Sequence, residues 1–402
     1  MDFSIIKAAD LYPYGEEAGR YNCGDECGTI LYRNTDECEF RKFIGDIKAR
    51  DDWKPWQENV LKDNLFFTFT GERGMLHATY TAYSKTVRLV FDTLKTNDLP
   101  SDAPQTYKKI TEPTLCVMAL DYSHRDVTDG NGMSYVFILA DGSYLIYDGG
   151  YPQDTDNLYG FLRDNCRRPD GKIVIAAWIF THAHYDHYGN FENFTDKYAD
   201  QVRVEQFVCN PVSAENLVNP KANDPYLEVR FPERIRSYSG ARLVRMHTGQ
   251  RLAVRDAVVE AWLCAEDLFS EQIRYLNEVS LVTKVYLAGQ SILLLADAEI
   301  VPDKILPQMY GDALKSDIFQ VAHHGYSGGN EELFRDISPR IAMWTTSQAA
   351  FDIRISDAWP RPQNRFLTRE MLMIERYLVA DGDCKLIRLP YNGEEPEHYT
   401  YR

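Results

Sequence analysis

The sequence predicts a mixed α/β protein built from two parts. Short β-rich runs separated by turn residues fill the first 112 residues, whereas from Thr114 onward apolar strand-like runs alternate with helical patterns. The stretch 97–113 contains three prolines among polar residues and is typical of a linker. We therefore expect a small α+β accessory domain over residues 1–112, of unknown role, and a larger α/β domain over residues 113–402.

The N-terminal part is predicted to contain an antiparallel sheet and one helix. The helix is expected over Glu39–Arg50, where Phe40, Phe43, Ile44 and Ile47 recur on one face. Clusters of Asn, Gly, Asp and Lys bound the β-rich runs, as turns do. The strands are expected at Gly28–Tyr32, Asn64–Thr70, Met75–Ala82 and Thr86–Phe91.

The larger part is predicted to alternate strands with helices. Asp141-Gly142 and Gly289 supply hairpin turns, and the continuous apolar run Val174–Phe180 is typical of a strand buried on both faces. Helical spacing is found over Asp154–Asn165 and Thr368–Tyr377. Further strands are expected at Leu115–Leu120, Tyr135–Leu139, Ser143–Tyr147, Leu281–Leu287, Ser291–Ala296, Ile341–Thr345 and Lys385–Leu389.

Composition and charge restrict the class of protein. A chain of 402 residues that is 44% hydrophobic can build more than one core. The 44 Lys and Arg against 60 Asp and Glu give a net charge of −16, which repels polyanions and argues against broad nucleic-acid binding. The sequence has neither an apolar run of about 18 residues nor a secretory signal pattern. We expect no membrane span and a cytoplasmic location.

The eight cysteines are scattered, and only Cys23 and Cys27 lie close together in the sequence. A second cysteine pair at metal-ligand spacing is absent. The sequence therefore favours free thiols in a reducing compartment over a cysteine-based zinc site.

The run Thr181-His182-Ala183-His184-Tyr185-Asp186-His187 places four potential metal ligands in six residues. Histidine-rich loops also occur on surfaces by chance, but this run finds partners downstream: Asp297, His323 and His324 each follow a strand-like apolar run. Loops at strand ends gather ligands in α/β proteins, and imidazole and carboxylate suit zinc, manganese or iron. The pattern predicts a site for two metal ions.

These residues resemble the metallo-β-lactamase superfamily over about residues 113–402. The resemblance implies a four-layer αββα sandwich, preceded here by the small α+β domain, and a metal-dependent hydrolase. Within the superfamily, the motifs are most similar to the hydrolase domain of bacterial competence DNA-uptake proteins and to choline-phosphate esterases of cell-wall teichoic acid. The likeness is carried by Tyr147–Gly150, Thr181–Gly189, Asn277–Val282, Leu295–Asp297 and Ala322–Gly325.

One ligand of the superfamily pattern is missing from its usual place. The register of the motif puts Asn277 where the family has its middle histidine, and the only histidine between His187 and Asp297 is His247. An amide oxygen is a poorer zinc ligand than imidazole, so the first ion would be held more weakly or be a harder metal such as manganese. His247 stays open as an alternative ligand.

The resemblance also implies a role for each residue. His182 and His184, with Asn277, would hold the first of two divalent ions, with zinc preferred over manganese or iron. Asp186 and His187 would hold the second, and Asp186 would also steer the attacking water. Four further residues complete the set. Asp297 would bridge both ions, and either His323 or His324 would ligate while the other stabilises negative charge on the substrate. Asp148 would orient metal-bound imidazoles, unless it is only a turn residue.

The leading hypothesis is therefore a hydrolase that attacks a phosphodiester or phosphoester with a metal-activated water. One alternative keeps the chemistry but changes the bond to a lactone, thioester or amide. Another class remains open, a binding or scaffolding protein with a structural metal site. The sequence does not define the substrate or the oligomeric state.

Overall fold

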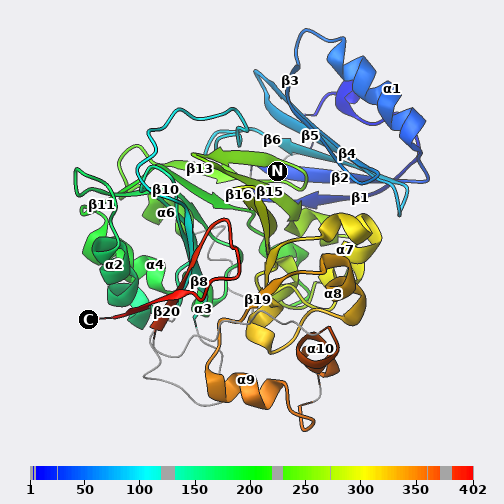
Figure 1. Ribbon diagram of the computed structural model, residues 1–402. Coiled ribbons are helices and arrows are strands. Elements are labelled where there is room, and N and C mark those ends of the chain that lie inside the picture. The colour runs from blue at the N-terminus through cyan, green and yellow to red at the C-terminus, as the bar shows by residue number, and fades with distance from the viewer. Residues whose placement is uncertain are drawn as a thin grey trace.

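The computed structural model describes residues 3, 6–24, 26–118, 132–219, 230–271, 273–359, 361–371 and 383–401. Figure 1 shows two facing sheets with helices on their outer sides, and the N-terminal sheet lying against one end of this body. The first sheet is antiparallel and has the strand order β1-β2-β6-β5-β4-β3. Its strands are β1 (Glu16–Asn22), β2 (Cys27–Arg33), β3 (Lys54–Leu61), β4 (Asn64–Gly71), β5 (Gly74–Thr81) and β6 (Thr86–Asp92).

Helix α1 (Glu37–Lys48) packs on this N-terminal sheet as the sequence predicts. Asp36 caps its start by accepting a 2.9 Å hydrogen bond from the Glu39 backbone N–H. The buried face of the helix consists of Phe40, Phe43, Ile44 and Ile47.

Two strands of this sheet, β1 and β3, were not expected from the sequence. Both lie at the ends of the strand order and are largely exposed. Edge strands carry polar side chains and need no apolar run, so hydrophobic periodicity does not reveal them.

The second sheet has the strand order β13-β12-β10-β9-β8-β7-β20-β21, with β11 paired to β10. Its pairing of β7 with β20 joins residues that are far apart in the chain, Leu115 and Ile387 among them. The strands are β7 (Thr114–Val117), β8 (Ser134–Ile138), β9 (Tyr144–Asp148), β10 (Ile173–Ile179), β11 (Val202–Val204), β12 (Gln206–Cys209), β13 (Arg242–Arg245), β20 (Asp383–Arg388) and β21 (Glu397–Thr400).

The third sheet has the strand order β14-β15-β16-β17-β18-β19. Its first four strands are antiparallel, and β17, β18 and β19 run parallel. The strands are β14 (Arg251–Val254), β15 (Ala257–Leu263), β16 (Val282–Leu287), β17 (Gln290–Leu294), β18 (Ile318–Gln320) and β19 (Ile341–Met343).

The second and third sheets pack face to face, and helices cover their outer sides. One buried cluster joins Phe137 and Ile179 of the second sheet to Val259 and Ile292 of the third. The helices are α2 (Thr155–Asp164), α3 (Tyr185–Tyr188), α4 (Asn190–Tyr198) and α6 (Phe231–Ile235) beside the second sheet, α7 (Pro302–Tyr310) and α8 (Glu331–Ile337) beside the third, and α9 (Gln348–Arg354) and α10 (Pro362–Arg365) later in the chain. The predicted αββα sandwich is confirmed.

The helix predicted over Thr368–Tyr377 is found only in part. Phe366–Glu370 forms a π-helical turn, and residues 372–382 lie outside the described part of the chain. None of the helices in the described ranges is long and apolar enough to cross a bilayer. No disulfide joins any of the eight cysteines, all of which lie in the described part of the chain.

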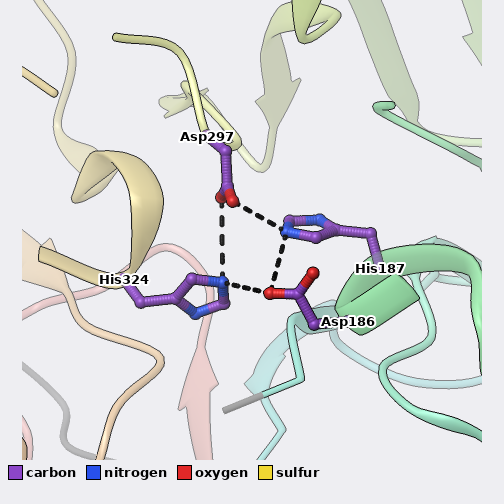
Figure 2. A group of neighbouring side chains, drawn as sticks. All are labelled: Asp186, His187, Asp297 and His324. Carbon is purple, nitrogen blue, oxygen red and sulfur yellow. Dashed lines mark ion pairs between the residues drawn. The ribbon is translucent and has the colours of Figure 1, made fainter. Parts of the chain in front are cut away.

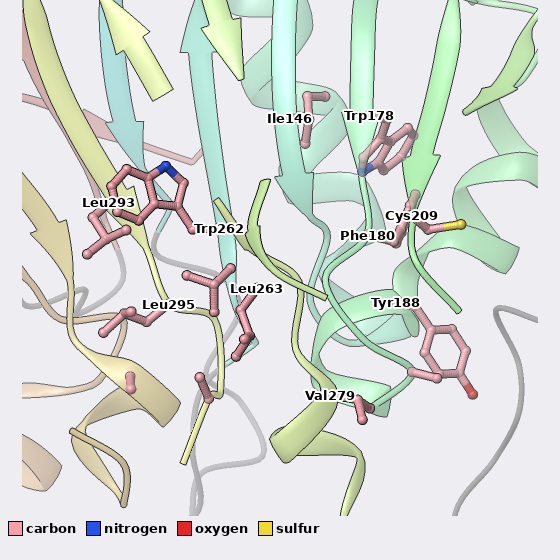
Figure 3. Packing of buried hydrophobic residues seen from close by; sticks show 14 of the residues in the cluster. Ile146, Trp178, Phe180, Tyr188, Cys209, Trp262, Leu263, Val279, Leu293 and Leu295 are labelled. Atoms are coloured by element: carbon pink, nitrogen blue, oxygen red, sulfur yellow. The ribbon is translucent and has the colours of Figure 1, made fainter. Parts of the chain in front are cut away.

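Large aromatic residues fill the outer layers next to the strand ends. Figure 3 shows Trp178 and Phe180 at the end of β10 and Trp262 and Leu293 on the third sheet. The Trp178 indole donates a 3.0 Å hydrogen bond to the carbonyl of Asp148. The packed core thereby fixes the loop that follows β9.

The N-terminal sheet and the sandwich meet through strand β3. Gln57 donates to the carbonyl of Arg251 at 2.7 Å and accepts from its N–H at 3.0 Å. Asn59 donates to the carbonyl of Gly249 at 3.0 Å. These bonds between side chains of β3 and the backbone of Gly249 and Arg251 fix β3 against the start of β14, so the N-terminal sheet has a specific docking position.

We expect Gly249→Ala to loosen this junction. Gly249 has a φ of +86°, and a Cβ there would lie 2.1 Å from the Phe66 ring. Unfavourable backbone conformation and overpacking together should lower the free energy of unfolding by about 2 to 4 kcal/mol. Urea unfolding measures the change.

Gly289→Ala is the matched control for that experiment. Gly289 has a φ of +77°, but nothing lies within 4 Å of its ideal Cβ, so it reports the backbone cost alone, about 1 to 2 kcal/mol. Equal losses in the two variants would contradict a tight contact between Gly249 and Phe66.

Candidate metal centre

The predicted ligands lie where strands end at one edge of the two facing sheets. Asp148 is the last residue of β9, and Thr181 follows β10, the parallel neighbour of β9. Asp297 follows β17, and His323 follows β18, which is parallel to β17. Because the carboxyl ends of parallel strands share an edge, segments that are distant in the sequence meet here.

Figure 2 shows one group, formed by Asp186, His187, Asp297 and His324. Asp297 Oδ2 lies 3.1 Å from His187 Nε2, and Asp297 Oδ1 lies 3.8 Å from His324 Nε2. Asp186 Oδ2 lies 3.4 Å from His324 Nε2. One ligand atom from each residue lies within 4.8 Å of the other three, a spacing that suits a single shared cation.

A second group contains His182, His184 and Asp297, again with ligand atoms within 4.8 Å of one another. His182 Nε2 lies 3.8 Å from Asp297 Oδ2, and the ring centres of the two histidines are 4.8 Å apart. Asp297 belongs to both groups. Its carboxylate therefore lies where it can contact two cations at once.

Buried atoms without hydrogen-bond partners line this centre. They are His182 Nε2, His187 Nε2, His324 Nε2 and both carboxylate oxygens of Asp297. Leaving such atoms unpaired inside a protein is costly, and all of them are atom types that bind zinc, manganese or iron. The residues present thus fit a pair of divalent cations.

The other ring nitrogen of each buried histidine is held by the protein. His187 Nδ1 lies 2.8 Å from Asp148 Oδ2, and His324 Nδ1 lies 2.9 Å from the Thr345 carbonyl. His182 Nδ1 lies 3.1 Å from the Thr181 hydroxyl. A proton on Nδ1 that is donated to an oxygen leaves Nε2 with a free lone pair, as in metal-ligating histidines generally.

Asp148 is fully buried, and its carboxylate contacts residues beyond the turn in which it lies. Its carboxylate accepts hydrogen bonds from the Thr181 N–H at 2.9 Å and the Thr181 hydroxyl at 2.8 Å, besides its contact with His187. It ties the end of β9 to the start of the histidine-rich run.

Four residues at this centre have a strained backbone. Asp148, Ala296, His323 and His324 have φ values of 51°, 50°, 47° and 52°, in the left-handed region. Each such residue costs about 1–3 kcal/mol, and such strain persists at sites where the surrounding structure enforces it. The centre is therefore held in shape by its surroundings.

The two adjacent histidines face different neighbours. His324 is 1% exposed and belongs to the group in Figure 2. His323 has a side chain 21% exposed, and its Nδ1 lies 2.7 Å from the Ser327 hydroxyl and 3.8 Å from Glu299 Oε2. Its Nε2 lies 3.7 Å from Asp297 Oδ2. His323 thus borders the centre from a more open side.

Asn277 lies with His323 and not among the unpaired imidazoles. Its side-chain amide donates to Glu299 Oε1 at 2.8 Å and lies 3.4 Å from the His323 ring nitrogens. Its Oδ1 is buried without a hydrogen-bond partner. The role of Asn277 as a metal ligand stays a prediction.

The electrostatics of the centre follow from burial and charge. Burial lowers the pKa of His182 well below its usual value, so this imidazole is neutral and able to ligate. Burial acts in the same direction on His187, but the carboxylates of Asp297, Asp186 and Asp148 outweigh it and raise the pKa of His187. This accumulation of carboxylates supplies the negative charge that a cation would neutralise.

Two features of the site escaped the sequence. Glu299 lies two residues after Asp297 and accepts hydrogen bonds from the Asn277 amide and the Ser327 hydroxyl. Its carboxylate is visible in the sequence triplet Asp297-Ala298-Glu299, but no motif marked it as part of the site. His247, considered as a ligand of the first ion, belongs instead to a separate group with Cys27 and Asp92.

The histidine-rich segment matches a known family. Residues 127–227 match the family model described as the metallo-beta-lactamase superfamily. This stretch is about a quarter of the chain and contains the whole run from Thr181 to His187. The matched stretch includes His182, His184, Asp186 and His187, whereas Asp297 and the pair His323-His324 lie outside it. This part of the chain is therefore similar to the superfamily that the sequence motifs resemble. None of the curated proteins compared with the chain matches it.

Solved structures give more distant likenesses. The metallo-beta-lactamase fold protein YhfI from Bacillus subtilis is 9% identical with a TM-score of 0.41, and the alignment covers 67% of this chain and 98% of YhfI. CmlA, a diiron beta-hydroxylase from Streptomyces venezuelae, is 14% identical with a TM-score of 0.40, over 71% of this chain and 55% of CmlA. A Cronobacter sakazakii metallo-beta-lactamase with a HARLDQ motif is 14% identical with a TM-score of 0.29, over 48% of this chain and 74% of that one.

Proposed function

We propose that this protein is a metal-dependent hydrolase with two divalent cations, and that its substrate is a phosphodiester or phosphoester. The observation that carries the proposal is the position of Asp297, whose buried carboxylate belongs to both ligand groups and accepts no hydrogen bond on either oxygen. His182 and His184 would hold one cation, with Asn277 as the predicted further ligand. Asp186, His187 and His324 would hold the other, and zinc is the first choice for both.

Two bound cations would supply a water of lowered pKa and offset the charge that develops on the attacked centre. The chain itself fixes the ligands. Asp148 and the carbonyl of Thr345 hold the rings of His187 and His324 with Nε2 toward Asp297. Asp186, whose side chain is 20% exposed, is the carboxylate best placed to accept a hydrogen bond from the attacking water.

His323 is the group that we assign to the substrate. Burial lowers its pKa, but the nearby carboxylates of Asp297 and Glu299 outweigh this effect and raise the pKa of His323. Glu299 continues to act in this direction when cations compensate the charge of Asp297. A protonated His323 beside the centre would stabilise a phosphoryl oxygen or donate a proton to the leaving oxygen.

The phosphoester assignment rests on this cationic group and on the motif resemblance to competence-protein hydrolase domains and choline-phosphate esterases. Exposed Tyr185 and Tyr326 flank the ligands, and Tyr326 packs 5.3 Å from the His323 ring. They provide apolar surface for the organic part of the substrate. Fold alone does not decide between esters, so the bond cleaved has to be measured.

The test compares initial rates of the zinc- and manganese-loaded protein on a panel of phosphoester and acyl substrates. Bis-p-nitrophenyl phosphate and p-nitrophenyl phosphate represent phosphoesters, and an acyl ester, a thioester and a lactone represent the alternative. We expect the phosphodiester or phosphomonoester to be cleaved with the highest kcat/KM. Preference for an acyl substrate would overturn the phosphoester assignment, and cleavage of none would favour a binding protein with a structural metal site.

His323→Gln separates the substrate group from the metal ligands. We expect it to keep its bound metal and to lose about 100-fold or more in kcat on phosphoesters. The loss should be larger for an alkyl than for a p-nitrophenyl leaving group, because the better leaving group needs no proton. An unchanged kcat would remove His323 from the reaction.

A further inference from the structure

A second cluster of potential ligands is buried between the N-terminal sheet and the sandwich, apart from the centre described above. Cys27 begins β2, Asp92 ends β6, and the two residues face each other across the strand pair. His247 follows β13 of the second sheet. One ligand atom from each lies within 4.8 Å of the other two, and the residues are 0%, 2% and 1% exposed.

The imidazole of His247 is arranged like that of a metal-ligating histidine. Its Nδ1 lies 2.8 Å from the buried carboxylate of Glu266, while its Nε2 is buried and has no hydrogen-bond partner. Carboxylate contact on one nitrogen and a free lone pair on the other is the usual arrangement of a metal-ligating histidine.

A neighbouring histidine shows the contrast. His77 stacks on His247 with ring centres 5.8 Å apart, and both of its nitrogens are used, Nδ1 by the Thr68 hydroxyl at 2.9 Å and Nε2 by the Thr248 carbonyl at 3.0 Å. His77 is an ordinary core histidine. The unpaired nitrogen of His247 therefore does not arise from a general shortage of partners in this core.

Cys23 lies beside the cluster and offers a second thiol. The Cys23 N–H donates a 2.8 Å hydrogen bond to the Cys27 carbonyl, and Cys23 is 4% exposed. Its sulfur is outside the group of three ligand atoms that lie within 4.8 Å of one another. With Cys23 as a fourth ligand, the set would comprise two sulfurs, one imidazole nitrogen and one carboxylate oxygen.

The charges also allow a divalent cation. The carboxylate of Asp92 lies 3.5 Å from Arg245 Nη1, and that of Glu266 lies 2.8 Å from His247 Nδ1. Binding of a cation would release the thiol protons of Cys23 and Cys27, and the two thiolates would then offset its charge of +2.

We propose that Cys23, Cys27, Asp92 and His247 bind a structural zinc ion that fastens the N-terminal sheet to the sandwich. Four ligands of thiolate, imidazole and carboxylate type favour zinc. All four residues are buried, which is typical of a structural zinc site because a catalytic site keeps one position open to solvent or substrate. The sequence favoured free thiols here because it shows only one close cysteine pair. The other two ligands, Asp92 and His247, are distant in the sequence and approach the cysteines only in the folded protein.

Cobalt(II) gives a readout that is independent of activity and of the Asp297 centre. The full-length protein is produced in cobalt-supplemented medium, and its near-ultraviolet absorption is recorded. A thiolate bound to cobalt gives a charge-transfer band, and none of the ligands assigned to the Asp297 centre is a cysteine. We expect the band in the wild type, its retention in Asp297→Ala, its reduction in Cys27→Ser, and its loss when Cys23 and Cys27 are both replaced by Ser.

Cys116→Ser is the control, since Cys116 is fully buried in β7 and outside the cluster; it should keep the band. His247→Gln, which spares both thiols, should weaken or shift the band. If Cys27→Ser does not fold, the wild-type spectrum and His247→Gln decide the matter. Absence of the band in wild-type protein that holds cobalt, its survival when both Cys23 and Cys27 are replaced by Ser, or a Cys23–Cys27 disulfide in place of metal would overturn the proposal.

Discussion

Asp297→Ala is expected to lower turnover at least about 1,000-fold on the best substrate of the panel. The variant removes the carboxylate whose oxygens lie 3.1 Å from His187 Nε2 and 3.8 Å from His324 Nε2 and which also belongs to the group of His182 and His184. Loss of a group on which both cations depend should remove most of the transition-state stabilisation. Initial rates at saturating substrate, with circular dichroism to check the fold, measure the effect.

Asp317→Ala is the matched control. Asp317 precedes β18 and accepts a hydrogen bond from the Ser291 N–H at 2.9 Å, at the end of the β17–β18 pair opposite to Asp297. It should cost some stability and leave turnover within a few-fold of the wild type. A folded Asp297→Ala variant with wild-type turnover would contradict the role of Asp297.

Asp148→Asn is expected to weaken metal binding about 10- to 100-fold without unfolding the protein. The carboxylate accepts from the Thr181 N–H, the Thr181 hydroxyl and His187 Nδ1. An amide keeps one acceptor and turns the other into a donor. When its oxygen stays with the Thr181 N–H, its NH2 faces His187 Nδ1, which drives the ring proton to Nε2 and removes the lone pair that ligates.

A competition titration with a chromophoric chelator measures this loss. Asp141→Asn serves as the control, because Asp141 lies in the turn of the same hairpin and contacts Ser143 and Arg255 instead of a histidine. Its metal affinity should match that of the wild type. Equal affinities of Asp148→Asn and wild type would show that Asp148 has no part in orienting His187.

The candidate site could be located from the sequence because its residues follow apolar runs directly. Ile173–Ile179 leads into the histidine-rich loop, and Gln290–Leu294 leads to Asp297, so strand prediction and motif coincide. The sequence does not distinguish the inward-facing histidine from the exposed one in the pair His323-His324. Both residues adopt a left-handed backbone, so the alternation of side chains along a strand does not apply to them. This local geometry turns one ring inward and leaves the other partly exposed.

The parts of the fold that escaped the sequence depend on partners distant in the chain. The edge strands β1 and β3 are polar because only one of their sides pairs within the sheet. The destination of His247 depends on how the N-terminal sheet docks, which brings it to Cys27 and Asp92. No local sequence pattern predicts either contact. The burial of a strand such as β10, in contrast, can be predicted from its own run of apolar residues.

The most direct test of the central claim is the metal content of the wild type and Asp297→Ala, measured side by side by elemental mass spectrometry after metal-replete purification. If Asp297 bridges two cations, the variant should hold about two equivalents fewer than the wild type, while any metal at the cluster of Cys27, Asp92 and His247 remains in both. A difference of one equivalent or none would contradict a dinuclear centre bridged by Asp297.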